Sequence, residues 1–174
     1  MRVKKCWSFW PVANFLFISV AGVLLHFLYE WTGESFVVAF VSGVNESTWE
    51  HMKLLFVPLL LFAIIQRLCR KDHTDTLWCR TFWSALAGLA VIPLLYYTYT
   101  GALGISADWF NIVIFFVAAA VTSLVACRFT KRCALPRWVA VSGLIFLGGL
   151  FVLFTFAPPA IPLFRDPITG TYGI

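Results

Sequence analysis

Apolar residues fall along this chain in long blocks that are separated by short polar segments. The blocks show neither the strict alternation of a half-buried strand nor the narrow stripe of a soluble amphipathic helix. A helix needs roughly 17–25 residues to cross the hydrocarbon core of a bilayer, and five blocks meet that length. The pattern therefore predicts an all-α integral membrane bundle of about five transmembrane helices, over residues 9–29, 51–68, 81–99, 109–127 and 138–156.

Two further segments do not fit the pattern of a span. The apolar stretch 36–44 is too short to cross and predicts a re-entrant or interfacial segment. The C-terminal stretch 157–174 contains four prolines and should be extended, yet it keeps too many large apolar residues for a disordered tail. We therefore expect a transmembrane domain over 1–156, followed by an extracytoplasmic Pro-rich tail that packs over the outer face.

The composition supports a membrane protein and orients it. Hydrophobic residues make up 61% of the chain and charged residues 12%, whereas a soluble domain has about 25% charged residues. Apart from Lys53 and Arg165, the basic residues lie in or beside the segments 1–8, 69–80 and 128–137. Because cytoplasmic loops are enriched in Lys and Arg, we expect the N-terminus in the cytoplasm and the tail outside, in a multi-pass protein of the cell membrane. The formal charge of +5 is then a topology signal. The expected partner is the lipid bilayer, and no nucleic acid is predicted.

Tryptophan and cysteine positions agree with this orientation. All eight tryptophans lie at or near predicted span ends, where an amphipathic ring suits the headgroup layer. All five cysteines lie on or near the cytoplasmic side, where thiols stay reduced. The sequence therefore predicts no structural disulfide.

The polar side chains on the outer side concentrate around the start of the second span, in the segment NESTWEHMK at 45–53. The first span adds His26 and Glu30, which share a helical face because they are spaced i,i+4. Since ionisable groups at membrane depth are costly, they indicate a functional site. The candidate binding pocket comprises His26, Glu30, Asn45, Glu46, Glu50, His51, Lys53, Arg165 and Asp166.

Each of these residues also has a structural interpretation. Residues 47–50 read STWE, a capping box in which the serine hydroxyl and the glutamate satisfy backbone amides at a helix start. An unpaired ammonium at Lys53 could cost ~2.5–3.5 kcal/mol deep in the bilayer, so snorkelling or an ion pair is expected. Glu46, Glu50 and Lys53 would share a face at i, i+4 and i+7 of one helix. His26 could simply bond to a neighbouring helix.

Metal binding is an open alternative here. His26, Glu30, Glu46, Glu50 and His51 are suitable ligand types for zinc or manganese, and His26, Glu50 and His51 are the candidate set. However, adjacent helical residues diverge by about 100°, so Glu50 and His51 do not easily serve one ion. Lys53 would also repel a cation. The sequence thus favours no metal site and predicts no cofactor, with a divalent metal kept as the alternative.

Two motifs carry a family resemblance that extends over the whole chain. The segment VNESTWEHMKLLFVP at Val44–Pro58 and the closing DPITGTYGI at Asp166–Ile174 are fairly specific together. With them the chain resembles an uncharacterised family of small bacterial multi-span membrane proteins, defined by N-E-S-x-W-E-H-x-K and D-P-x-T-G-x-Y-G-I. The resemblance implies a bacterial membrane protein and supplies no mechanism.

Three functional hypotheses follow from these observations. The leading one is binding or transport of a small polar or cationic solute through an outward-facing polar pocket, with Glu30, Glu46 and Glu50 holding the cationic group and the tail as a lid. The second is an intramembrane enzyme, metal-dependent or acid/base, in which His26, Glu50 and His51 would act; no catalytic residue is assigned. The third is an accessory or structural subunit. Since the chain shows no internal repeat, a transporter of this size would be a homo-oligomer.

Overall fold

The computed structural model describes residues 9–69, 76–129 and 133–174, and within these ranges the chain is helical without β-strands. Five helices in the described residues are long and apolar enough to cross a membrane. This confirms the prediction of an all-helical chain with five such helices. The elements are α1 (Phe9–Trp31), η1 (Val38–Phe40), α2 (Thr48–Cys69), α3 (Thr76–Leu103), α4 (Asp108–Arg128), α5 (Arg137–Phe156) and η2 (Pro162–Phe164), η denoting a short 3₁₀-helix.

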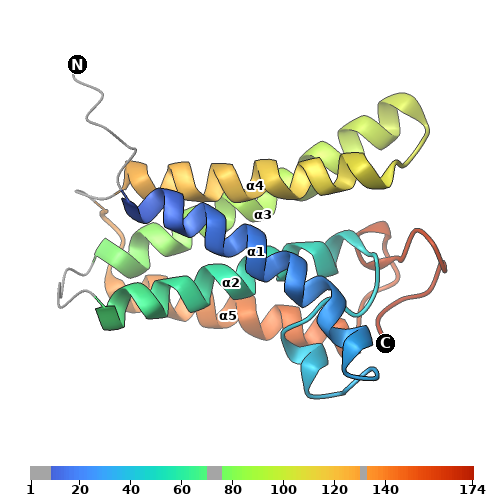
Figure 1. Ribbon diagram of the computed structural model, residues 1–174, viewed down its shortest axis with the longest axis horizontal. Coiled ribbons are helices and arrows are strands. Elements are labelled where there is room, and N and C mark those ends of the chain that lie inside the picture. Colours follow the sequence, from blue (N-terminus) through green and yellow to red (C-terminus); the bar gives the residue numbers. More distant parts are fainter. Residues whose placement is uncertain (1–8, 70–75, 130–132) are drawn as a thin grey trace.

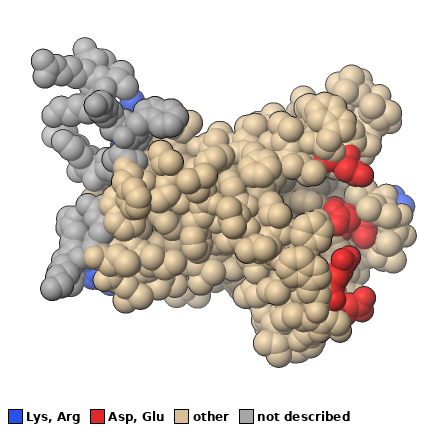
Figure 2. All heavy atoms as spheres, in the orientation of Figure 1, with Lys and Arg blue, Asp and Glu red and all other residues tan. Residues whose placement is uncertain are grey.

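The helices run side by side in alternating directions (Figure 1). The two ends of the bundle differ in the charged residues that they carry. Figure 2 shows the aspartates and glutamates of the described residues gathered at one of them. We call this the acidic end; it holds the C-terminal ends of α1, α3 and α5, the N-terminal ends of α2 and α4, and the tail. The opposite, basic end carries Arg67, Arg80, Arg128 and Arg137 among the described residues.

Glycines let α4 approach its neighbours closely. A Cβ at Gly88 of α3 would collide with the Thr122 hydroxyl and lie 3.3 Å from the Ala118 carbonyl oxygen, both on α4. A Cβ at Gly22 of α1 would in the same way meet the Phe115 ring. Such small residues at helix crossings are typical of packing in membranes, where close van der Waals contact holds helices together.

The tail packs onto the acidic end of the bundle. Phe164 of η2 is 4% exposed and packs against Trp49 and Phe154, with ring centroids 4.9 Å and 5.1 Å away. Further along, the Asn45 side-chain amide donates to the Gly173 carbonyl at 2.9 Å. The tail is therefore attached both to the start of α2 and to the end of α5.

The segment between α1 and α2 contains the short apolar stretch 36–44. Residues 38–40 of this stretch form the single turn η1, in which Ala39 is fully buried. Phe36 and Val37, just before the turn, are exposed. The Ser42 hydroxyl donates to the Leu25 carbonyl of α1 and ties the segment back to the bundle. This segment positions the residues that lead into α2.

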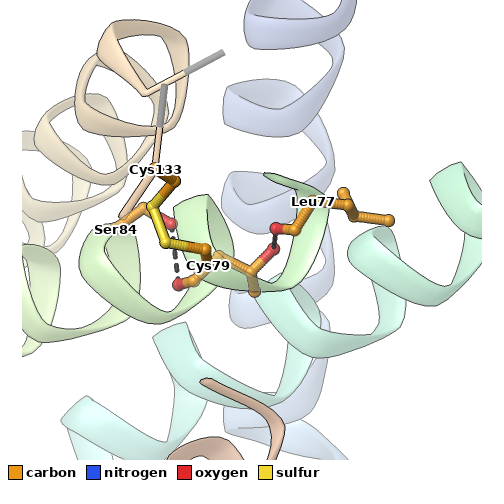
Figure 3. Close-up of a disulfide and its surroundings, with 5 residues drawn as sticks. Leu77, Cys79, Ser84 and Cys133 are labelled. Carbon is orange, nitrogen blue, oxygen red and sulfur yellow. Dashed lines mark hydrogen bonds between the residues drawn. A yellow bond between two sulfur atoms is a disulfide. The ribbon is translucent and has the colours of Figure 1, made fainter. Parts of the chain in front are cut away.

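The prediction that the chain has no disulfide is wrong. Cys79, in the first turns of α3, is bonded to Cys133, which lies shortly before α5 (Figure 3). Their Cα atoms are 6.1 Å apart, within the range for a disulfide, although 54 positions separate them in the chain. The start of α3 and the approach to α5 meet at the basic end, and this proximity cannot be seen from cysteine spacing. Cys69 is an exposed free thiol at the same end.

Candidate functional site

The first turn of α2 organises the polar side chains at the acidic end. The Ser47 hydroxyl accepts from the Glu50 amide at 3.3 Å, as an N-cap does, and the Ser47 amide donates to the Asn45 side-chain oxygen at 3.0 Å. Only this half of the predicted capping box forms in the structure. Since Asn45 already satisfies the Ser47 amide, the Glu50 carboxylate is available for another partner.

That partner is Lys53, one turn along α2. Lys53 Nζ lies 2.6 Å from Glu50 Oε2, and the two side chains are 0% and 3% exposed. Lys53 also donates to the Ala39 carbonyl of η1 at 2.9 Å and to the Thr155 hydroxyl of α5 at 2.8 Å. Thr155 Oγ1 is in turn 2.8 Å from Glu50 Oε1. We call Glu50, Lys53 and Thr155 the buried ion-pair cluster; it joins α2, α5 and η1.

Removing charges from water is costly unless each is paired and hydrogen-bonded. Here the ammonium has three partners, and the Glu50 carboxylate also accepts from the Val44 amide at 3.2 Å. The cluster is closed to solvent, and its two charged groups are paired and hydrogen-bonded within the fold. Its geometry fits a structural role better than ligand binding.

Glu46 does not share this face, contrary to the i, i+4, i+7 prediction. Helix α2 begins at Thr48, so Glu46 lies before the helix, and the i, i+4 spacing does not determine where its side chain points. Its Oε1 lies 3.4 Å from His26 Nε2 on α1, and its Oε2 lies 3.6 Å from His51 Nε2 on α2. We call these three residues the His–Glu–His cluster. Its side chains are 23–39% exposed, so the cluster is half-buried and open to solvent.

A hydrogen bond orients one of the two histidines. His51 Nδ1 lies 3.0 Å from the Ser47 carbonyl oxygen. A carbonyl can only accept, so Nδ1 is the protonated nitrogen. When the ring is neutral, Nε2 then carries the lone pair, and it is Nε2 that faces Glu46. The N-cap residue therefore also fixes which histidine nitrogen is available to a ligand.

The His–Glu–His cluster opens onto a cavity of about 480 Å³ between α1, the start of α2 and α4. Asp108 and Asn111 of α4 add polar groups to its wall, and the remaining lining is mainly apolar. Asn111 is held by Tyr99, whose hydroxyl donates to Asn111 Oδ1 at 2.6 Å. The lining comprises Gly22, Val23, His26, Phe27, Glu46, His51, Leu54, Asp108, Asn111, Ile112, Phe115, Phe116 and Ile168.

The other predicted pocket residues lie elsewhere. Glu30 is exposed near the end of α1 and does not line the cavity, and Asn45 links the α2 start to the tail. Arg165 is exposed, and its backbone pairs with Tyr172 in an isolated antiparallel bridge. Asp166 is 4% exposed and accepts from the Ile168 and Thr169 amides at 2.7 Å and 3.3 Å, which makes it a turn-forming residue.

The sequence did not single out Thr155 or Asn111. Thr155 lies near the end of an apolar span, where a threonine usually bonds to its own helix, and it is indeed 2.9 Å from the Phe151 carbonyl. Its second role becomes visible once α5 is placed beside Lys53. Asn111 carried a weak signal, because a polar amide one turn inside a span faces a helix or a cavity in preference to lipid.

These features define an all-helical protein with five candidate membrane spans and a polar cavity at its acidic end. The chain belongs to a family of unknown function, DUF6512, whose profile matches residues 1–174. Comparison with curated proteins gives no match, and comparison with solved structures gives none either.

Proposed function

We propose that this chain is a multi-pass membrane protein that binds a small cationic solute in the cavity at its acidic end. The observation that carries the proposal is the convergence of His26, Glu46 and His51, from three separate segments, on a cavity of about 480 Å³. Cavities of this size, with a few polar groups on an otherwise apolar wall, are the usual form of small-molecule sites.

The charge of the lining supports a cation. Glu46 and Asp108 both line the cavity, and no Lys or Arg lines it among the described residues. The buried Lys53 is held by Glu50 in the buried ion-pair cluster. A low-dielectric wall strengthens the attraction of the carboxylates for a cation. The apolar wall of α4 favours a solute that also carries a hydrocarbon part.

The proposed orientation places the cavity on the outer side of a bacterial cell membrane. Arg67, Arg80, Arg128 and Arg137 would then face the cytoplasm, in keeping with the enrichment of basic residues in cytoplasmic loops. The Cys79–Cys133 disulfide at the same end argues for the opposite orientation, because cytoplasmic thiols usually stay reduced. The tail, anchored through Phe164, would lie outside beside the cavity, with Ile168 on its wall. The chain shows no internal repeat of the kind expected in a monomeric transporter. We therefore propose that it acts as one subunit of a homo-oligomer.

Thermal unfolding of purified protein with a series from methylammonium to hexylammonium chloride tests this function at constant ionic strength. A bound ligand raises the unfolding midpoint by mass action, and each added CH₂ buried against the α4 wall contributes about 0.8 kcal/mol. We expect the shift to grow with chain length in wild type. It should vanish in Glu46→Gln and persist in Glu34→Gln, which changes an exposed carboxylate outside the cavity.

A second pair of variants tests the cavity itself. Ile112→Trp places a larger side chain on the cavity wall and should abolish the shift, whereas Ile145→Trp on α5, which is 70% exposed, should retain it. The proposal fails if neither an alkylammonium ion nor a metal ion stabilises wild type. It also fails if Glu46→Gln responds as wild type does.

A further inference from the structure

We infer that the His–Glu–His cluster is a site for a divalent transition-metal ion, best matched by zinc. The inference rests on the proposed function and names the cation that the cluster selects. The sequence offers several carboxylates as ligands, and the structure brings Glu46 beside the two histidines in place of Glu50, the carboxylate of the candidate set.

The geometry of the three side chains is close to that of a bound site. One ligand atom from each of His26, Glu46 and His51 lies within 4.8 Å of the others. Zinc binds imidazole nitrogen and carboxylate oxygen at about 2.0–2.1 Å, so tetrahedral ligand atoms lie about 3.3 Å apart. The His26–Glu46 and His51–Glu46 separations of 3.4 Å and 3.6 Å are already near this value. The two imidazole nitrogens, which lie within 4.8 Å of each other, would need side-chain rotations to reach the same spacing.

The hydrogen bond between His51 and Ser47 is a second and independent indication. Histidines that ligate metals almost always donate their other ring N–H to a carboxylate or a backbone carbonyl, which fixes the tautomer. His51 does this through Nδ1 at 3.0 Å from the Ser47 carbonyl, and it presents Nε2 to the cluster. The same serine caps α2, so the helix start and the ligand nitrogen are positioned together.

The electrostatic objection raised by Lys53 does not hold in the structure. Its ammonium is 2.6 Å from Glu50 and fully buried with Thr155 and Ala39, whereas Glu46 is directed to the histidines. Asp108 adds a second carboxylate to the wall of the same cavity. Two imidazoles with one carboxylate favour zinc and similar ions over magnesium and calcium, which prefer all-oxygen sites.

The cluster also leaves a coordination position for a solute. Zinc sites with three protein ligands keep the fourth position for water or a bound molecule. All three ligands line the 480 Å³ cavity, so the fourth coordination position would face the cavity and its apolar α4 wall. The site is therefore suited to a metal ion that is carried with a donor-bearing small molecule, or to a metal ion with its water.

Calorimetric titration of the tag-free, full-length protein with zinc chloride tests the inference. We expect one zinc per chain in wild type, with magnesium and calcium unable to compete. His26→Gln, His51→Gln and Glu46→Gln should each weaken zinc binding at least tenfold. Glu34→Gln and Cys69→Ser should bind as wild type does, because these residues lie outside the cluster.

Cobalt(II) absorption of wild type alone provides a measurement that requires no variant to fold. Intense visible bands from a four- or five-coordinate ion are expected, and zinc should displace them. Zinc binding that is unchanged in both histidine variants overturns the inference, as does a weak octahedral cobalt spectrum. If hexylammonium stabilises the protein while zinc does not bind, the inference fails and the proposed function stands. If neither binds, both fail.

Discussion

Lys53 Nζ lies 2.6 Å from Glu50 Oε2, and both side chains are closed off from solvent by α5 and η1. This pair is close to the His–Glu–His cluster in the sequence, but its side chains contact different residues. The polar residues at the start of α2 therefore divide into a buried group that is paired within the fold and an open group that we propose binds a ligand. The division leads to predictions that distinguish the two.

Breaking the buried pair should destabilise the fold more than removing it. Lys53→Met leaves the Glu50 carboxylate without its cation, and Glu50→Gln leaves Lys53 without its anion. Loss of one partner of a buried pair costs about 3–5 kcal/mol, whereas replacing both partners is often neutral. We expect each single variant to lose several kcal/mol of unfolding free energy in denaturant titrations, and the double variant to recover most of that loss. Additive losses would show that the two residues are not coupled.

The close approach of α3 and α4 should not tolerate a side chain at Gly88. Gly88→Val would force its Cβ into the Thr122 hydroxyl and toward Leu55. Overpacking of this kind costs about 1–3 kcal/mol. Gly149→Val on α5 is the matched control, because a Cβ there meets nothing within 4 Å. Equal thermal midpoints for the two variants would contradict the packing described for α3 and α4.

The tail should detach when its aromatic anchor is removed. Phe164 is 4% exposed between Trp49 and Phe154, and truncating a buried phenylalanine costs about 3–5 kcal/mol in a well-packed core. We expect Phe164→Ala to make residues 157–174 sensitive to limited proteolysis while the helices stay protected. Ile174→Ala, at a position that is 63% exposed, should leave the tail as resistant as in wild type. A resistant Phe164→Ala tail would show that Phe164 is not the anchor.

The two ends of the bundle should lie on opposite sides of the membrane. A membrane-impermeant maleimide applied to intact cells should label Ile105→Cys, which is exposed in the loop between α3 and α4. The exposed Cys69 thiol at the basic end should react after permeabilisation. The reverse result would invert the topology. It would also place the Cys79–Cys133 disulfide in an oxidising compartment, where such bonds persist.

The sequence predicts the helices well because length and hydropathy are local properties. It places the third span at residues 81–99, whereas α3 runs from Thr76 to Leu103, because polar and aromatic residues at both ends continue the helix beyond the apolar block. The helical spacing also identifies the Glu50–Lys53 pair. These predictions all depend on neighbours along one element.

Contacts between elements are harder to predict from the sequence. Helical spacing assigns Glu46 to the face of Glu50, but α2 begins two residues later and frees Glu46 to reach His26 on α1. The Cys79–Cys133 bond and the Thr155–Lys53 contact span 54 and 102 positions, and no local pattern marks them. Asp166 is a further case: the sequence suggests a pocket residue, and the structure shows its carboxylate accepting from the Ile168 amide within a turn.

One binding comparison tests the division of the acidic end most directly. Zinc and hexylammonium are titrated into the Glu46→Gln variant and into the Glu50→Gln/Lys53→Met double variant under the same conditions. If Glu46 belongs to the ligand site and Glu50 to the fold, the first variant loses affinity and the second keeps that of wild type. Loss of binding in the folded double variant, with Glu46→Gln unaffected, would contradict the account.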